Sequence, residues 1–459
     1  MNESTLKVEG ARYIITVDPQ RRIIEDGTVV VQGQRIVQIG KRNELAEVSA
    51  DRVMDARGMV ITPGFCNGHL HVSYAHATRG IFPDDLGPDY LPNVFKLQAS
   101  MTAEEEYYTS LLGITELLKY GTTCFLDPGS TKFPSVCLQA YEESGCRIII
   151  GAQVVDQENP LNIPIDSTNE AVSKMRDVIE TYDGKLDGRV RAWAMPFSAD
   201  YASLELLQEA KGLADAHDTG LTLHQSNAAP SVQMSLDRYG RRPVEHLEDI
   251  GVLGPNTLLA HVIGLNESEV DVMARTRTNA VMCPTAALKM GGGTTSRGML
   301  PEMLANGVTV GLGTDAANNS NLVETMRSMY LAAVLYKDGR QSTEMISAES
   351  ALEMATIGGA KALGLGGDIG SIEVGKKADL VLFDTRRAEW RTLFNPVNNL
   401  VYGADGRSVH TVIVDGNVRV EDHRPIYVDE WDLIQKVQAL GTDLMARTGV
   451  SFPSRWPLV

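Results

Sequence analysis

Met59-Val-Ile-Thr-Pro-Gly-Phe-Cys-Asn-Gly-His-Leu-His71 is an apolar stretch that ends in two histidines separated by one residue. In an extended strand, side chains two residues apart point to the same side. Both imidazoles can therefore reach one cation, while Leu70 points the other way into packing. The pair predicts a metal site, but it is weak evidence alone, because a histidine is often a hydrogen-bonded core residue.

Eight apolar runs of strand length alternate with helical patterns along the central part of the chain. They are Val60–Phe65, Gly121–Leu126, Arg147–Ala152, Val190–Met195, Leu221–His224, Thr257–His261, Asn279–Cys283 and Val308–Gly313. Runs of this length and apolarity are typical of strands buried on both faces of a parallel sheet. Eight such units predict an α/β fold, the (β/α)8 TIM barrel.

Three further residues of ligand type lie at or just beyond the ends of later runs: His224 ends the fifth, His261 ends the sixth and Asp315 follows the eighth. His69 and His71 follow the first run. Barrel active sites are built at the carboxyl ends of the strands, so we expect these five side chains at one mouth of the barrel. Each histidine alone could be a core or surface residue, but the combined order favours a metal site.

The two ends of the chain share a second pattern, in which short β-type runs are broken by Gly and Asp. At 459 residues the chain is too long for one ordinary core, so two domains are expected. We predict a small β-sandwich formed by residues 1–60 and 366–430, a metal-dependent barrel from 61 to 365, and a C-terminal helical tail from 431 to 459.

The composition excludes several partners. A formal charge of −17 argues against nucleic-acid binding, which needs clustered Lys and Arg. The sequence has neither the apolar core of a signal peptide nor 18 uninterrupted apolar residues, so we expect a cytoplasmic protein that does not bind membranes. Five cysteines without CxxC spacing indicate neither a disulfide framework nor a thiolate zinc site.

The ligand-type residues also predict a chemistry. His69, His71 and His224 offer imidazole nitrogens and Asp315 a carboxylate oxygen, a set that suits one divalent metal. Zinc is the first expectation, with cobalt, iron and manganese left open. A metal lowers the pKa of a bound water, and Asp315 is expected to take its proton and pass it to a leaving group. His261 is expected to polarise a substrate carbonyl or to hold the water.

Five motifs carry a family resemblance: Pro63–His71, Leu223-His224, Ala260-His261, Gly313–Leu322 and Gly370–Val381. On these motifs the chain resembles the amidohydrolase superfamily, in particular its mononuclear branch of guanine and adenosine-type deaminases and triazine hydrolases. Within that branch it is most similar to phenylurea hydrolases or molinate hydrolase. The resemblance implies a barrel with a β-sandwich and a hydrolase acting on carbon–nitrogen bonds other than peptide bonds. Two-metal branches use a strand-four lysine, which Trp193–Tyr201 lacks, so one metal is expected.

Asn227, three residues after His224, departs from the pattern of the deaminases. They carry a glutamate there that moves a proton to the ring nitrogen, and an amide cannot act as a general acid near neutral pH. We therefore expect metal-bound hydroxide to cleave the carbonyl C–N or C–S bond of an aryl urea, as in phenylurea herbicides, or a thiocarbamate, releasing an aniline-type amine in xenobiotic degradation. The alternative is an aminohydrolase or dechlorinating hydrolase on a purine, pyrimidine or s-triazine ring, with another acid. A scaffold protein without catalysis is a third hypothesis, disfavoured by the complete ligand set.

A segment rich in Pro and Gly follows the first metal motif and suits a loop over the barrel mouth. Its aromatic residues either wall an apolar substrate pocket or pack the loop. The candidate substrate contacts are Phe82, Tyr90, Phe95, Phe197, Asn227, Met290 and Ser320. Ser320 can equally cap the following helix. Since no Arg or Lys cluster accompanies them, we expect a neutral small-molecule substrate of aromatic or apolar character. We also expect the enzyme to be a homo-oligomer.

Overall fold

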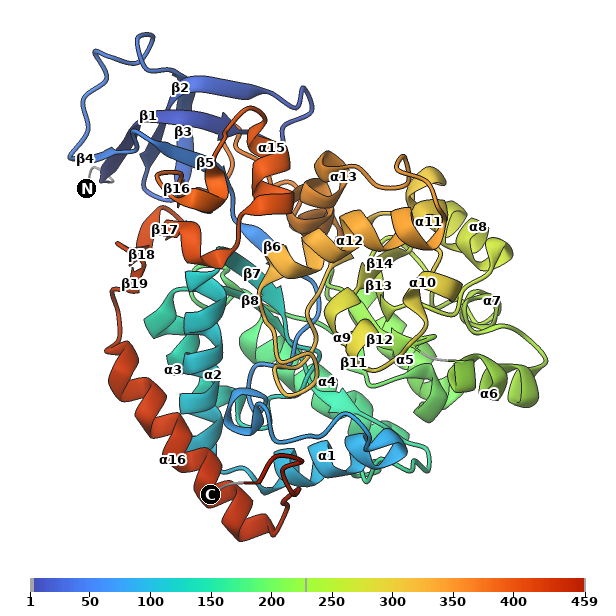
Figure 1. Ribbon diagram of the computed structural model, residues 1–459. Helices are drawn as coiled ribbons and strands as arrows, with labels where there is room; N and C mark the ends of the chain where they lie inside the picture. Colours follow the sequence, from blue (N-terminus) through green and yellow to red (C-terminus); the bar gives the residue numbers. More distant parts are fainter. Residues whose placement is uncertain (1–3, 228, 458–459) are drawn as a thin grey trace.

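The computed structural model describes residues 4–227 and 229–457, and a parallel sheet of eight strands lies at its centre (Figure 1). In hydrogen-bonded order the strands are β10 (Val190–Ala192), β8 (Arg147–Ile150), β7 (Thr122–Leu126), β6 (Phe65–Asn67), β15 (Val310–Leu312), β14 (Asn279–Met282), β13 (Thr257–His261) and β12 (Leu221–Gln225). Each predicted apolar run overlaps one of these strands.

The two edges of this sheet meet just beyond β10. The N–H of Ala194 donates to the carbonyl oxygen of Gly220 at 3.0 Å, and the N–H of Thr222 donates to that of Ala194 at 3.1 Å. Farther along, the N–H of His224 donates to the carbonyl oxygen of Phe197 at 3.0 Å. These bonds close the sheet on itself, and the predicted α/β fold with a (β/α)8 barrel is confirmed.

Both ends of the chain contribute to a second sheet of nine strands, at the upper left of Figure 1. Its path is β19 (Arg424–Pro425), β18 (Asn417–Glu421), β17 (Val409–Val414), β16 (Leu380–Asp384), β5 (Met59–Pro63), β1 (Thr5–Ile15), β2 (Ile23–Gln32) and β3 (Arg35–Lys41), with β4 (Arg52–Asp55) paired to β1. A buried apolar cluster that includes Val8, Val29, Leu380 and Ile413 joins strands from the two chain ends.

The first predicted run is divided between the two sheets at Gly64. Residues Met59–Pro63 pair with β1 and β16, whereas the barrel strand β6 begins at Phe65. A Cβ atom on Gly64 would lie 2.1 Å from Oγ1 of Thr123, so glycine is required where the chain passes β7. Apolar residues continue through both strands, and the sequence pattern therefore did not reveal this break.

Helices surround the barrel strands and begin at well-defined caps. The main ones are α1 (Tyr90–Ser100), α2 (Ala103–Lys119), α3 (Pro134–Ser144), α4 (Thr168–Tyr182), α5 (Leu204–Ala216), α6 (Ala229–Tyr239), α7 (Pro243–Asp249), α8 (Glu267–Thr276), α9 (Pro284–Lys289), α10 (Thr294–Arg297), α11 (Leu300–Ala305), α12 (Thr325–Gly339), α13 (Ala348–Glu353), α14 (Gly359–Ala362), α15 (Pro396–Asn398) and α16 (Glu430–Thr448). Capping boxes start α2, α4 and α8 at Thr102, Ser167 and Asn266. In each box, the side chain of the capping residue accepts from the N–H of the third helical residue. The side chain of that third residue accepts in turn from the N–H of the capping residue, so two free N–H groups are satisfied.

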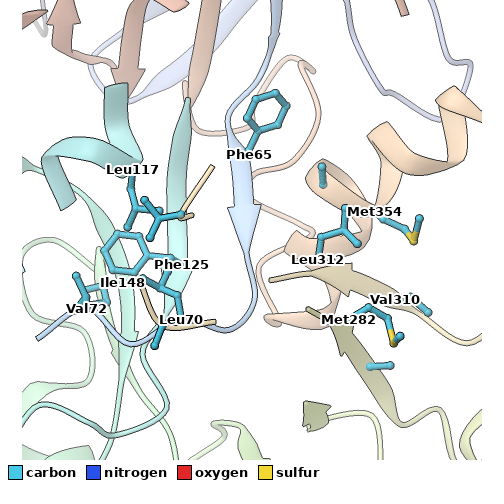
Figure 2. Packing of buried hydrophobic residues seen from close by; sticks show 14 of the residues in the cluster. Phe65, Leu70, Val72, Leu117, Phe125, Ile148, Met282, Val310, Leu312 and Met354 are labelled. Atoms are coloured by element: carbon cyan, nitrogen blue, oxygen red, sulfur yellow. The ribbon is translucent and has the colours of Figure 1, made fainter. Parts of the chain in front are cut away.

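Leu70, between the two histidines of the first motif, belongs to the barrel core. Figure 2 shows it beside Phe125 of β7 and Ile148 of β8, and all three side chains are fully buried. The N–H of Leu70 also donates to the carbonyl oxygen of Leu126 at 3.0 Å, which continues the pairing with β7 past the end of β6. Packing of Leu70 therefore anchors the chain at the point where both histidines emerge.

No helix within residues 4–227 and 229–457 combines the length and the apolar character needed to cross a bilayer.

Candidate metal centre

Five polar residues meet at the carboxyl ends of four barrel strands. His224 lies near the end of β12, and His261 is the last residue of β13. Ligand atoms of His69, His224 and His261 lie within 4.8 Å of one another, and the same holds for His69, His71 and Asp315. The structure therefore brings together all the ligand-type residues that the sequence pattern selected.

Two of these residues have left-handed backbone conformations that residues other than glycine seldom adopt. The φ angle is 76° at His261 and 61° at Asp315. Such conformations persist where the surrounding structure holds them in place. The N–H of Asp315 donates to the carbonyl oxygen of His69 at 3.0 Å. This bond ties the ligands of the first and eighth barrel strands to each other.

Asn67, the last residue of β6, clamps the same two strands together. Its Nδ2 donates to Oγ1 of Thr314 at 2.8 Å, and its Oδ1 accepts from the N–H of Thr314 at 3.2 Å. The side chain is fully buried. Sequence reasoning did not select Asn67, although a buried amide two residues before His69 was an available signal.

Asp127, directly after β7, holds the chain next to the second histidine. Its Oδ2 accepts from the N–H of Val72 at 3.1 Å, one residue after His71. Its Oδ1 accepts from the N–H and from Oγ of Ser130, both at 2.7 Å. Asp127 was also missed, and its place at the end of the second apolar run was the signal that could have identified it.

Burial keeps the imidazoles of His69, His224 and His261 neutral. Removal from water lowers the pKa of His69 well below its ordinary value of 6.5, and the neighbouring imidazoles of His224 and His261 lower it further. Burial likewise lowers the pKa of His224 to about 3, and it lowers the pKa of His261. A neutral imidazole is the form that coordinates a metal ion.

Unpartnered ring nitrogens show that these residues fit a cation. Among the described residues, Nδ1 and Nε2 of His69 and Nδ1 of His71 are buried without a hydrogen-bond partner. An unsatisfied buried polar group costs about 1–3 kcal/mol, so coordination supplies what the protein does not. His224 donates from Nδ1 to the carbonyl oxygen of Phe197 at 2.6 Å, which leaves Nε2 for a metal.

The two carboxylate oxygens of Asp315 have different surroundings. Oδ1 accepts from the N–H of Ala316 at 2.7 Å and lies 3.5 Å from Nε2 of His71. Oδ2 accepts from Nδ2 of Asn319 at 3.0 Å. Burial raises the pKa of Asp315, but the neighbouring polar imidazoles of His261 and His71 and the backbone hydrogen bond from Ala316 outweigh this effect, so its pKa is lowered. Asp315 is therefore ionised near neutral pH.

The histidine and aspartate motifs on this barrel lie in a region matched by one family model, described as the amidohydrolase family, over residues 60–419. The chain belongs to the amidohydrolase family. Its predicted enzyme class is confirmed, since relatives in this family are deaminases and hydrolases that act on carbon–nitrogen bonds.

This amidohydrolase is similar over nearly its whole length to curated deaminases. It is 31% identical over 441 residues to a 5′-deoxyadenosine deaminase of Methanobrevibacter smithii, which covers 95% of this chain and 98% of that protein. It is also 31% identical over 427 residues to a 5-methylthioadenosine/S-adenosylhomocysteine deaminase of Syntrophobacter fumaroxidans, which covers 93% of this chain and 95% of that protein.

Solved structures resemble it equally broadly. An adenosine deaminase from Xanthomonas campestris with bound zinc has 26% sequence identity and a TM-score of 0.87, and covers 97% of this chain and 98% of its own. An atrazine chlorohydrolase from Arthrobacter aurescens TC1 complexed with zinc has 25% identity and a TM-score of 0.87, and covers 95% of this chain and 100% of its own. The predicted resemblance to deaminases and triazine hydrolases is confirmed at this level.

The predicted specificity for phenylureas or thiocarbamates is wrong, and so is the predicted role in herbicide degradation. The curated relatives are deaminases of modified adenosines, so the alternative aminohydrolase reading is the better supported one. The error lay in the weight given to Asn227. A proton donor is defined by its position around the substrate, and spacing along the chain does not give that position.

Three of the predicted substrate contacts lie together at the barrel mouth of this amidohydrolase. Phe82, Tyr90 and Met290 line one pocket, together with Lys289 and Asn319. The rings of Phe82 and Tyr90 meet edge to face with their centroids 5.1 Å apart. Because Asn319 also donates to Asp315, this pocket adjoins the metal centre.

Phe197 and Phe95 lie on another side of the centre. The ring centroid of Phe197 is 4.6 Å from that of His224 and 5.7 Å from that of Phe95. Phe95 packs behind Phe197 in a small buried cluster that also contains Val155 and Leu161. Phe197 is thus the residue of this pair that directly contacts a candidate metal ligand.

Ser320 and Asn227 lie outside both aromatic groups. Oγ of Ser320 is within hydrogen-bonding distance of the carbonyl oxygens of Thr314 and Leu322, at 3.0 and 2.8 Å, and accepts from the N–H of Leu322 at 3.2 Å. These bonds stabilise the loop after Asp315. Asn227 is exposed in the loop that follows β12.

Tyr74, which sequence reasoning missed, lies beside the candidate metal ligands. Its side chain is 3% exposed, and its ring centroid is 5.7 Å from that of His71. Burial, with smaller effects of Tyr90 and Asp315, raises the pKa of Tyr74, so the phenol stays protonated. A neutral donor is thus available next to the centre.

Proposed function

We propose that this amidohydrolase deaminates the adenine ring of nucleosides that are altered at the 5′ position, releasing ammonia. The observation that carries this proposal is the 31% identity to a 5′-deoxyadenosine deaminase over 95% of this chain and 98% of that relative. The five ligand-type residues at one barrel mouth support it, because they supply what hydrolytic deamination needs: a cation site and a base.

We propose zinc as the metal, held by His69, His71, His224 and Asp315. Three neutral imidazoles and a carboxylate are a common zinc ligand set, and two similar structures contain zinc. Bound zinc would lower the pKa of a water molecule and so provide the nucleophile near neutral pH.

Asp315 would transfer a proton in the reaction, and His261 would hold the attacking oxygen. The ionised carboxylate of Asp315 accepts a proton from the attacking water, whose oxygen bonds to the ring carbon that carries the amino group. Asp315 then returns this proton to the amino nitrogen, the carbon–nitrogen bond breaks, and ammonia leaves. His261, whose ring is 4.9 Å from that of His69, is placed to hold the attacking oxygen by a hydrogen bond.

We propose that Tyr74 supports the ring nitrogen in place of the absent glutamate. Addition of water to the ring builds negative charge on the adjacent nitrogen, and a hydrogen-bond donor stabilises that charge. The side chain of Tyr74 is 3% exposed and burial raises its pKa, so the phenol is protonated and can donate to a ring acceptor. Phe197, next to His224, offers an apolar face for the adenine ring of the substrate.

The mouth pocket favours an uncharged nucleoside over a nucleotide. Its lining contains one cationic side chain, Lys289, and one carboxylate, Asp84. Opposite charges in one pocket do not form the cluster of positive groups that a phosphate needs. Association into a homo-oligomer stays a prediction.

The test is ammonia release by zinc-reconstituted enzyme from a panel of substrates. The panel comprises 5′-deoxyadenosine, 5′-methylthioadenosine, S-adenosylhomocysteine, adenosine, adenosine monophosphate, guanine, a chlorotriazine and an N,N-dimethyl-N′-aryl urea. We expect the highest kcat/KM with a 5′-modified adenosine and no aniline from the urea. The Asp315→Asn variant, purified in parallel, controls for contaminating deaminases. Turnover of the triazine or guanine alone would overturn the proposal.

A further inference from the structure

The end of the chain returns to the barrel mouth after α16. A Cβ atom on Gly441 would lie 2.4 Å from the carbonyl oxygen of Ala77, so this helix approaches the loop after the first metal motif at backbone distance. Arg447, in its last turn, donates to Oε2 of Glu105 on α2 at 2.8 Å. Gly449 ends the helix with a φ of 64°. Residues 449–457, called the tail below, follow this helix and are drawn in dark red at the bottom of Figure 1.

The tail contacts the loop over the mouth at two points. The ring of Phe452 packs on that of Phe82, with centroids 5.8 Å apart. An Arg455 guanidinium nitrogen lies 2.7 Å from Oδ2 of Asp85. Val450 is buried at the base of the tail, 5% exposed. The tail is therefore attached to the molecule by packing at its base and to the loop by one aromatic and one ionic contact.

The loop that receives these contacts has little structure of its own. Between the short helical turns His76–Thr78 and Gly87–Asp89, residues 79–86 form neither helix nor strand. A segment without a backbone ladder depends on side-chain contacts for its conformation. Phe82, in the middle of this segment, is nevertheless 8% exposed, and it packs on Tyr90 as well as on Phe452.

Phe82 connects the tail to the reactive centre. Phe82 also lines the mouth pocket, together with Tyr90 and Asn319. Asn319 in turn donates to Oδ2 of Asp315 at 3.0 Å. A change in the tail would thus alter the pocket wall without touching the metal ligands.

We propose that the tail positions the wall of the substrate pocket. Phe452 and Arg455 are positioning residues that act through Phe82 and Asp85, and they set the affinity for the part of the substrate that lies in the mouth pocket. This role concerns binding rather than chemistry, so it predicts an effect on KM and not on kcat. It does not depend on which ring substrate the enzyme converts.

The test combines kinetics with hydrogen exchange of residues 79–90 in the zinc-loaded enzyme. We expect Phe452→Ala to raise KM about three- to tenfold, the range of one lost aromatic pair, with kcat within about twofold. Exchange in residues 79–90 should become severalfold faster. Arg455→Asp should act in the same direction by about two- to threefold, as for an exposed ion pair. The double variant Asp85→Arg/Arg455→Asp should restore both readouts.

Lys436→Glu is the matched control. Lys436 also lies on the C-terminal segment, and its Nζ is 2.9 Å from Oε1 of Glu104 on α2, so this variant breaks an exposed ion pair that does not involve the mouth loop. It should change neither KM nor the exchange of residues 79–90. Unchanged KM and exchange in Phe452→Ala and Arg455→Asp would overturn the proposal. So would a loss of kcat and zinc with faster exchange throughout the barrel, because that result indicates general destabilisation.

Hydrogen exchange separates this proposal from the proposed function. If no compound in the panel releases ammonia, the exchange of residues 79–90 in the four variants still decides whether the tail holds the loop. If deamination is found and the exchange does not respond, only the tail proposal fails.

Discussion

Nδ2 of Asn319 donates a hydrogen bond to Oδ2 of Asp315 at 3.0 Å. Because Oδ1 is bonded to the N–H of Ala316 and faces His71, this amide fixes the rotation of the carboxylate. Asn319 also lines the mouth pocket, so one side chain contacts both the proposed base and the proposed substrate pocket.

Loss of this amide should impair turnover without loss of the metal. We expect Asn319→Ala to lower kcat about tenfold or more, because a misoriented base transfers protons less well. Zinc content, measured by mass spectrometry, should stay at one ion per chain. Asn321→Gly is the control: Asn321 lies on the same loop near Lys289, has a left-handed φ of 58°, and should tolerate glycine. Wild-type kcat in Asn319→Ala would contradict the orienting role.

Asp315→Asn should remove the base while it preserves barrel packing. We expect kcat to fall by about 10²–10⁴-fold, with an unchanged circular dichroism spectrum. Ammonia release and zinc content are the measurements, since Asp315 is both a ligand and the base. Asp183→Asn, whose carboxylate pairs instead with Arg191, should stay active. Activity above roughly a tenth of wild type would argue that another group takes the proton.

Tyr74→Phe tests the proposed donor to the ring nitrogen. Removal of one hydrogen bond to a group that gains charge should lower kcat roughly ten- to a hundredfold, with zinc retained. Tyr141→Phe is the control, because Tyr141 is fully buried and its hydroxyl lies 3.5 Å from Oγ1 of Thr131. Equal kcat values for Tyr74→Phe and wild type would remove Tyr74 from the mechanism.

Glu106 should make stability depend on pH. Burial raises the pKa of Glu106 from 4.5 to about 7, although its Oε2 accepts from the N–H groups of Lys132 and Phe133, both at 3.0 Å. The folded state then binds more protons than the unfolded state between these values. The contribution of protonated Glu106 to the free energy of unfolding is therefore complete below pH 4.5 and is lost as the pH rises through about 7.

The measurement is chemical denaturation of wild type and Glu106→Gln between pH 5 and 8. We expect the wild type to lose up to about 3 kcal/mol relative to the variant as the pH rises. Glu104→Gln, an exposed change on the same helix, should leave the wild-type pH profile unchanged. Parallel profiles for wild type and Glu106→Gln would show that this carboxyl does not titrate in the range.

Several features followed from local sequence patterns. Strand-length apolar runs identified the barrel strands, because burial on both faces leaves a continuous apolar signature. Ligand-type residues were recognisable because few side chains coordinate metals, and His69, His71, His224, His261 and Asp315 all follow or end such runs. The exchange of sheets at Gly64 was not predictable, since apolar residues occupy both sides of that break.

The substrate prediction failed for a related reason. The prediction equated Asn227 with the glutamate of the deaminases because of its spacing from His224. Spacing along the chain does not give the position of a side chain around the substrate. In the folded molecule Asn227 is exposed, whereas Tyr74, from a different strand end, lies buried beside His71. A residue at the matching position in the sequence need not occupy the matching position around the substrate.

By itself the sequence determined the barrel and the set of ligand-type residues, because periodicity and side-chain chemistry are local properties. Only the tertiary structure decided that Asn67 clamps Thr314, that Asp127 holds Val72, and that Phe452 packs on Phe82. Each of these contacts joins segments that are distant in sequence. Their geometry depends on barrel closure and on the path of the last helix, and no local pattern encodes either.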